Sequence, residues 1–119
     1  MKPVERSLGT RAAFLLPSLK LKGLTAAEGP TFEQSVHNFL LTHFDGYTAT
    51  AGNLFGFWKD AGGKDSYGEH RQFNVALTDE RKLPELKEYL ANLAHRMDEE
   101  CIYLETGGSA TLIYREQKN

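Results

Sequence analysis

Three consecutive ionisable residues, Glu69, His70 and Arg71, form the densest group of chemically capable side chains in the sequence. They follow a glycine-rich stretch and lead into an apolar strand pattern, and such junctions are frequent positions for binding residues. Glu69 or His70 could act as a general base here, and Arg71 could hold a carboxylate or phosphate group. The sequence therefore predicts a candidate catalytic site with a small anionic ligand.

The same residues also have a purely structural interpretation. Alternation along the strand puts Arg71 on the face of Phe73 and Val75, where a partly buried guanidinium needs a carboxylate partner. Glu69 lies two residues earlier on that face and is the predicted partner. Because structural ion pairs resemble functional sites when only a sequence is at hand, both interpretations stay open.

An aromatic cluster is predicted beside this junction. Its expected members are Tyr47, Phe55, Phe57 and Trp58. Aromatic walls are common in pockets for small ligands, but the same rings could belong to the core. Trp58 is the best candidate for ligand contact because its indole N–H needs a partner. Asn53 and Lys59 are its predicted neighbours in a ligand-binding site, together with Tyr47.

Neither the histidines nor the single cysteine indicates metal or nucleophile chemistry. His37 and His43 are six residues apart, so they lie on different faces of a helix, and we expect no metal and no cofactor. Cys101 opens a strand without a neighbouring histidine, which is typical of a small buried apolar residue. Gly62-Gly63-Lys64 lacks the spacing of a phosphate-binding loop.

Two amphipathic helices must support these residues. From Thr31 onwards, apolar residues recur at helical spacing up to Phe44, and Thr31 and Gln34 have the spacing of a capping box. Leu83 to Met97 shows the same periodicity, with Thr78 or Asp79 near its start. Proline is tolerated in a first helical turn, so Pro84 fits this second helix.

The remaining apolar patterns predict strands. They cover residues 11–16, 47–51, 54–58, 71–77, 101–105 and 109–115, with 61–68 as an exposed loop. The segment at 11–16 is expected in the centre of the sheet. Gly52-Asn53 is expected to form a tight hairpin or a bulge, and Thr106-Gly107-Gly108 the turn of a terminal hairpin.

This order predicts one α+β domain over residues 1–119. Two helices on one face of an antiparallel sheet give a ferredoxin-like β-α-β-β-α-β sandwich with extra hairpin strands. The length suffices for one hydrophobic core without disulfides or metal.

Charge and composition exclude several partners. Fourteen Lys and Arg against sixteen Asp and Glu give a net charge of −2, so no cationic field favours nucleic acid or an anionic membrane. One cysteine and the absence of a membrane-spanning stretch favour a cytoplasmic location.

Several of these residues also carry a family resemblance. Phe44-Asp45-Gly46-Tyr47-Thr48, Gly56-Phe57-Trp58 and Glu69 match a Phe-x-Gly-x-Thr, Gly-x-Trp and Glu pattern, with Tyr47 at a usually aliphatic position. In this pattern the chain resembles a family of small bacterial ferredoxin-like proteins of unknown function. The resemblance implies a fold and a place for polar residues, but no reaction.

Three functions remain open at this point. The first is a non-enzymatic binding or interaction module, a homodimer that pairs through a sheet face or an edge strand. The second is a small enzyme acting on an anionic metabolite through Glu69, His70 and Arg71. The third is an accessory or inhibitor protein of a phage or mobile element with one protein partner.

Overall fold

The computed structural model describes residues 1–115. They contain three helices and six strands, and the strands form one antiparallel sheet. The strands are β1 (Thr10–Pro17), β2 (Thr48–Ala49), β3 (Leu54–Lys59), β4 (Asp65–Leu77), β5 (Cys101–Thr106) and β6 (Ser109–Tyr114). The helices are α1 (Ser18–Leu21), α2 (Phe32–Phe44) and α3 (Lys82–Arg96). The predicted α+β class is confirmed.

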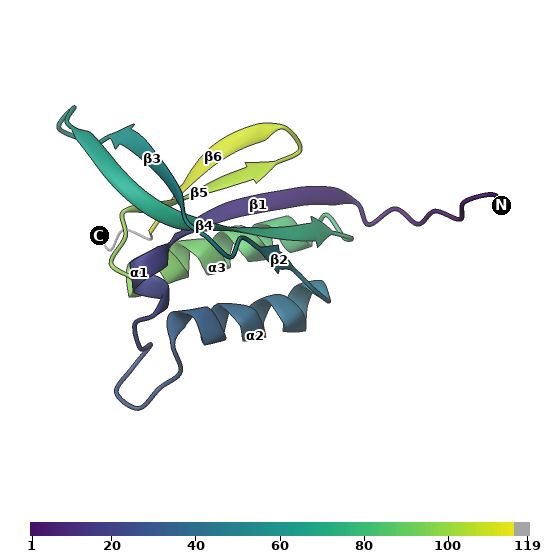
Figure 1. Ribbon diagram of the computed structural model, residues 1–119, viewed down its shortest axis with the longest axis horizontal. Coiled ribbons are helices and arrows are strands. Elements are labelled where there is room, and N and C mark those ends of the chain that lie inside the picture. The colour runs from purple at the N-terminus through teal and green to yellow at the C-terminus, as the bar shows by residue number, and fades with distance from the viewer. Residues whose placement is uncertain (116–119) are drawn as a thin grey trace.

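The strand order is β2-β4-β1-β5-β6, and β3 also pairs with β4. The central position predicted for the first strand is confirmed, because β1 pairs antiparallel with both β4 and β5. In Figure 1, α2 and α3 lie below the sheet, while the β3–β4 and β5–β6 hairpins rise on the opposite side. One face of the sheet is therefore packed against helices and the other is open.

The two predicted helices are present, and their ends follow from local chemistry. Thr31 Oγ1 accepts a hydrogen bond from the Gln34 backbone N–H at 3.1 Å, as expected for the N-cap of α2. Helix α2 ends at Asp45, whose φ of 63° is left-handed. At the start of α3, Asp79 Oδ1 accepts from the Arg81 N–H at 3.0 Å.

The core lies between the helices and the inner face of the sheet. Phe14 of β1 stacks on Phe73 of β4 with ring centroids 5.7 Å apart. Leu40 of α2 and Leu90 of α3 are completely buried against this layer. The alternation predicted for β4 is confirmed in its inner half, where Phe73, Val75 and Leu77 are buried.

The structure corrects one detail of the expected fold, decides a second and adds a third. Residues 65–68 belong to β4, so the exposed loop is much shorter than predicted. Of the hairpin and the bulge that the sequence left open at Gly52-Asn53, the structure has the bulge, because β2 and β3 both pair with β4 and residues 50–53 lie between them. The short helix α1 follows Pro17 without an apolar repeat that could have predicted it.

Candidate active site on the β3–β4 arm

Strand β3 and the outer half of β4 form a two-stranded extension of the sheet, which we call the arm (residues 54–70). Within it Phe55 pairs with Glu69, and Phe57 pairs with Tyr67. Cross-strand partners point to the same side of a sheet, so these four side chains share one face of the arm. The turn at its tip is closed by Asp60, whose Oδ1 accepts from the backbone N–H of Gly62 at 2.9 Å.

This shared face carries three open aromatic rings, and we call it the aromatic face of the arm. Phe55, Phe57 and Tyr67 are 71%, 69% and 54% exposed. The Phe57 and Tyr67 ring centroids are 5.3 Å apart, and those of Phe55 and Tyr67 are 6.3 Å apart. Soluble proteins rarely expose such a group of large apolar side chains, so this face is a candidate binding surface.

Glu69 brings a negative charge to the aromatic face. Desolvation raises the pKa of the Tyr67 hydroxyl, and the negative charge of the nearby Glu69 carboxylate raises it further. Aromatic ring faces attract cations, and a carboxylate beside them strengthens that attraction. The arrangement therefore suits a ligand with a flat ring and a positive charge.

The opposite face of the arm holds Trp58 and His70. Their rings meet edge to face at 5.2 Å, above the paired glycines Gly56 and Gly68. A Cβ atom on Gly68 would lie 2.6 Å from the His70 ring, and one on Gly56 would lie 2.8 Å from the Trp58 ring. Both positions therefore need glycine for the two rings to lie flat against the strands.

His70 Nδ1 is buried without a hydrogen-bond partner among residues 1–115. Burial lowers the pKa of His70 below its usual 6.5, and the negative charge of Glu99 only partly opposes this. The folded protein therefore favours neutral His70.

A pH-dependent stability follows from His70. Its folded pKa lies below 6.5, so its contribution is complete above that pH and is lost as pH falls through 6.5 towards the lowered value. We expect His70→Phe, which keeps a ring beside Trp58, to have a smaller loss of unfolding free energy between pH 7.5 and 5. Urea titrations at several pH values measure this, and His95→Phe is the control. An unchanged pH profile in His70→Phe would contradict the assignment.

Arg71 lies on the inner side of β4, but its predicted partner is wrong. Its guanidinium Nη1 forms an ion pair with Glu33 in the first turn of α2, not with Glu69. Arg71 Nε also donates to the Thr50 carbonyl at 2.9 Å, and the guanidinium lies 5.5 Å from the Phe73 ring centroid. Arg71 thus connects α2, the 50–53 bulge and β4.

The other predicted ligand-binding residues are dispersed. Tyr47 is not part of an aromatic cluster with Trp58, because its hydroxyl lies 2.8 Å from His37 Nδ1 of α2 and its ring packs on Phe73. Lys59 Nζ donates to Asp65 Oδ1 at 2.6 Å on the exposed tip of the arm. Asn53 is exposed in the 50–53 bulge. The predicted residues therefore divide into two groups on opposite faces of the arm, Phe55, Phe57 and Glu69 on one and Trp58 and His70 on the other.

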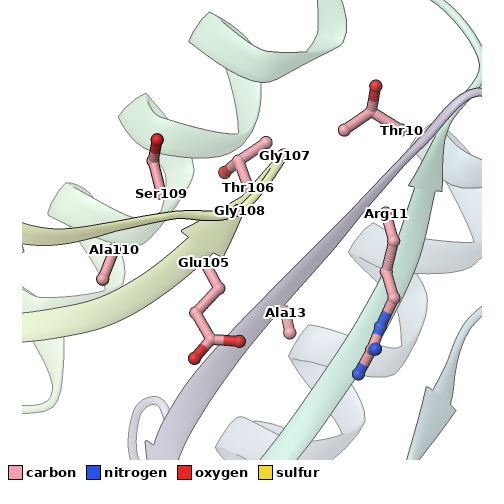
Figure 2. A pocket seen from close by; sticks show the side chains of 9 residues that line it. All are labelled: Thr10, Arg11, Ala13, Glu105, Thr106, Gly107, Gly108, Ser109 and Ala110. Atoms are coloured by element: carbon pink, nitrogen blue, oxygen red, sulfur yellow. The ribbon is translucent and has the colours of Figure 1, made fainter.

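A second candidate site was missed by sequence reasoning. A cavity of about 360 Å³ lies between the start of β1 and the β5–β6 turn. Its lining residues are Thr10, Arg11, Ala13, Glu105, Thr106, Gly107, Gly108, Ser109 and Ala110 (Figure 2). The only sequence signal was a charged residue, Arg11 or Glu105, within each of two otherwise apolar strand patterns.

Other chemistry finds little support in the part of the chain that is described. Within residues 1–115, no three His, Cys, Asp or Glu side chains are grouped so that they could hold a metal ion. Burial raises the pKa of the Cys101 thiol, and the charges of Glu100 and Glu99 add to this. Across the same residues, no helix is long and apolar enough to cross a membrane.

Comparison with known proteins gives similarity in structure but not in sequence. No model of a protein family and no curated protein matches the chain. A phage SAM lyase in complex with S-methyl-5′-thioadenosine is similar over 99% of this chain and 100% of its own, with a TM-score of 0.64 and 12% identity. A phage SAM lyase in the apo state has the same coverage, a TM-score of 0.57 and 11% identity. At these identities the similarity shows the fold alone.

Proposed function

We propose that this chain is an enzyme that cleaves S-adenosylmethionine (SAM) and releases S-methyl-5′-thioadenosine. The observation that carries the proposal is the aromatic face of the arm, where three open rings share one face with a carboxylate. The phage SAM lyase with bound S-methyl-5′-thioadenosine, which is similar over 99% of the chain, supports the choice of substrate.

The chemistry of SAM fits this face. Its adenine is a flat ring that can stack on Phe57 or Tyr67. Its sulfonium is a cation, which the ring faces and the Glu69 carboxylate attract. Arg71 is held by Glu33 and Thr50, so in this proposal it supports the base of the arm instead of anchoring an anion.

The bond that breaks joins the sulfonium sulfur to the γ-carbon of the methionine part. Its electron pair goes to sulfur, which becomes the neutral thioether of the released nucleoside. As this bond breaks, either a β-proton leaves and its C–H electron pair forms a C=C bond, or a carboxylate oxygen of the same fragment bonds to the γ-carbon and closes a lactone. Neither route consumes water. Glu69 serves both routes as the counter-charge that holds the sulfonium, and in the first route it can also accept the proton.

Self-association belongs to the same proposal. Binding sites usually enclose most of a small ligand, whereas Phe55 and Phe57 are about seven-tenths exposed in a single copy. We propose that a second copy covers the aromatic face, which extends the homodimer expected from the sequence. Light scattering should then give a mass of at least twice the 13.4 kDa of one chain. A monomer that still turns over SAM would contradict this part.

The proposal unites two of the three functions that the sequence left open, a small enzyme and a phage-type accessory protein. The non-enzymatic module has less support because the open rings and carboxylate suit a small cation.

We further propose a ferredoxin-like topology, supported by the order β2-β4-β1-β5 with all pairs antiparallel. A cytoplasmic location fits a substrate made inside cells and a single cysteine.

The proposal is tested by incubating the purified chain with SAM and measuring products by liquid chromatography and mass spectrometry. We expect S-methyl-5′-thioadenosine to accumulate in step with SAM loss, above the slow release seen with heat-denatured protein. A neutral analogue, S-adenosylhomocysteine, should not be cleaved, because its sulfur is a poor leaving group. SAM loss no faster than in the heat-denatured control would overturn the proposed function.

A further inference from the structure

The cavity between β1 and the β5–β6 turn lies on the open face of the sheet, and two opposite charges line it. Arg11 and Glu105 both belong to this cavity, and Figure 2 shows them on either side of Ala13. Among residues 1–115 neither charge takes part in an ion pair. A cation and an anion that share a cavity without neutralising each other are both available to a ligand.

A neighbouring side chain holds each charged group in place and leaves some of its hydrogen-bonding atoms available to a ligand. Arg11 Nη2 and Nε donate to Asn74 Oδ1 at 2.7 and 3.3 Å, so Nη1 keeps both of its hydrogens. The Tyr103 hydroxyl donates to Glu105 Oε1 at 2.7 Å, which leaves the second carboxylate oxygen open. That hydrogen bond also raises the pKa of Tyr103.

The register of the sheet sets the separation of the backbones on which the two charges are held. Ala13 pairs with Asn74 on one side and with Glu105 on the other. Neighbouring strands are about 4.8 Å apart, so the backbones that carry the Arg11 contact and Glu105 are roughly 10 Å apart. An α-amino acid that bridges this gap makes one charge-assisted hydrogen bond of about 2.8 Å through its carboxylate and another through its ammonium. These two bonds and the head group between them together span a length comparable to the backbone separation.

The remaining lining suits the same ligand. Gly107 and Gly108 turn the chain with φ of 55° and 83°, and a Cβ on Gly108 would meet nothing within 4 Å. The turn therefore leaves room for a side chain beyond the two charged groups. The volume of about 360 Å³ exceeds what one amino acid fills.

We propose that this cavity binds the α-amino-acid head group of a ligand, with Arg11 on its carboxylate and Glu105 on its ammonium. The head group could come from a free amino acid or from SAM held between two copies of the chain. The second source rests on the proposed function. The first does not, because the cavity and the aromatic face lie on opposite sides of the sheet.

Amide NMR of the whole chain tests the proposal, with Gly107 and Gly108 as reporters and L-methionine as the probe. We expect saturable shifts of these two amides. 4-(Methylthio)butanoic acid and 3-(methylthio)propylamine, which each carry one of the two charges, should bind at least about tenfold more weakly. Arg11→Gln and Glu105→Gln should each weaken L-methionine binding by a similar factor. Arg6→Gln and Glu5→Gln, in the exposed N-terminal segment, are the matched controls.

The outcomes separate the two sources. If SAM shifts the reporter amides and S-methyl-5′-thioadenosine does not, the substrate supplies the head group; if only L-methionine does, a free amino acid does. The proposal is overturned if neither SAM nor L-methionine shifts the reporter amides. It is also overturned if the singly charged analogues bind as tightly as L-methionine. Since Arg11→Gln also loses the Asn74 contact, Glu105→Gln keeps the test valid if Arg11→Gln unfolds. SAM turnover is measured separately, so the proposed function can stand if this inference fails.

Discussion

Replacing Glu69 by Gln should slow the release of S-methyl-5′-thioadenosine from SAM by at least about 100-fold. The substitution keeps the size of the side chain but removes the negative charge beside Phe55 and Tyr67. A sulfonium held only by aromatic rings loses its counter-charge, and a β-proton has no base to receive it. Initial rates at saturating and limiting SAM, followed by mass spectrometry, measure the effect.

Glu88→Gln is the matched control, because Glu88 is exposed on α3 and makes no ion pair with any residue between 1 and 115. It should retain the rate of the parent protein. The Glu69→Gln protein should keep its thermal stability, since Glu69 is exposed on the arm. Full activity in a folded Glu69→Gln protein would rule out Glu69 as the counter-charge.

Replacing Arg71 by Leu should lower the free energy of unfolding by about 2 kcal/mol, which corresponds to a fall in Tm of roughly 8 °C. The change leaves the Thr50 carbonyl and the Glu33 carboxylate without their donor. Glu33→Gln should cost less, because Arg71 would still donate to Thr50. Urea titrations of both proteins measure these losses.

A double-mutant cycle separates the ion pair from the other contacts of Arg71. The two single changes and the double change should give a coupling energy of about 1 kcal/mol between Arg71 and Glu33. The corresponding cycle with Glu69→Gln should give none, because Glu69 is not the partner of Arg71. Arg6→Leu, in the exposed N-terminal segment, controls for loss of an arginine. Coupling to Glu69 but not to Glu33 would contradict the structure.

The helices and the inner strands could be predicted because each buries one face. The repeat of Phe32, Val36, Leu40 and Phe44 has a single solution, a helix on a core. Phe73, Val75 and Leu77 likewise alternate because only one side of inner β4 meets the helices.

The outer half of β4 could not be predicted in the same way. Ser66 and Gly68 show no apolar alternation, because the arm has no core on either side and backbone pairing with β3 determines the strand. The choice between a hairpin and a bulge at residues 50–53 stayed open for a related reason. Gly52-Asn53 suits both, and only the long partner strand β4 decides between them.

The candidate site was predicted in part. Adjacent positions in a strand point to opposite faces, so Glu69 lies on the aromatic face and His70 beneath Trp58. Glu33, the partner of Arg71, lies 38 residues away in the sequence, and no local pattern connects the two. Arg11 and Glu105 line one cavity only because β1 and β5 are neighbours in the sheet.

A crystal structure of this protein with S-methyl-5′-thioadenosine tests the central claim most directly, since it places the nucleoside on a particular surface. We expect the adenine ring within about 4 Å of Phe57 or Tyr67, the sulfur towards Glu69, and a second copy over the arm. Nucleoside bound away from the arm, with an empty aromatic face, would contradict the proposed site.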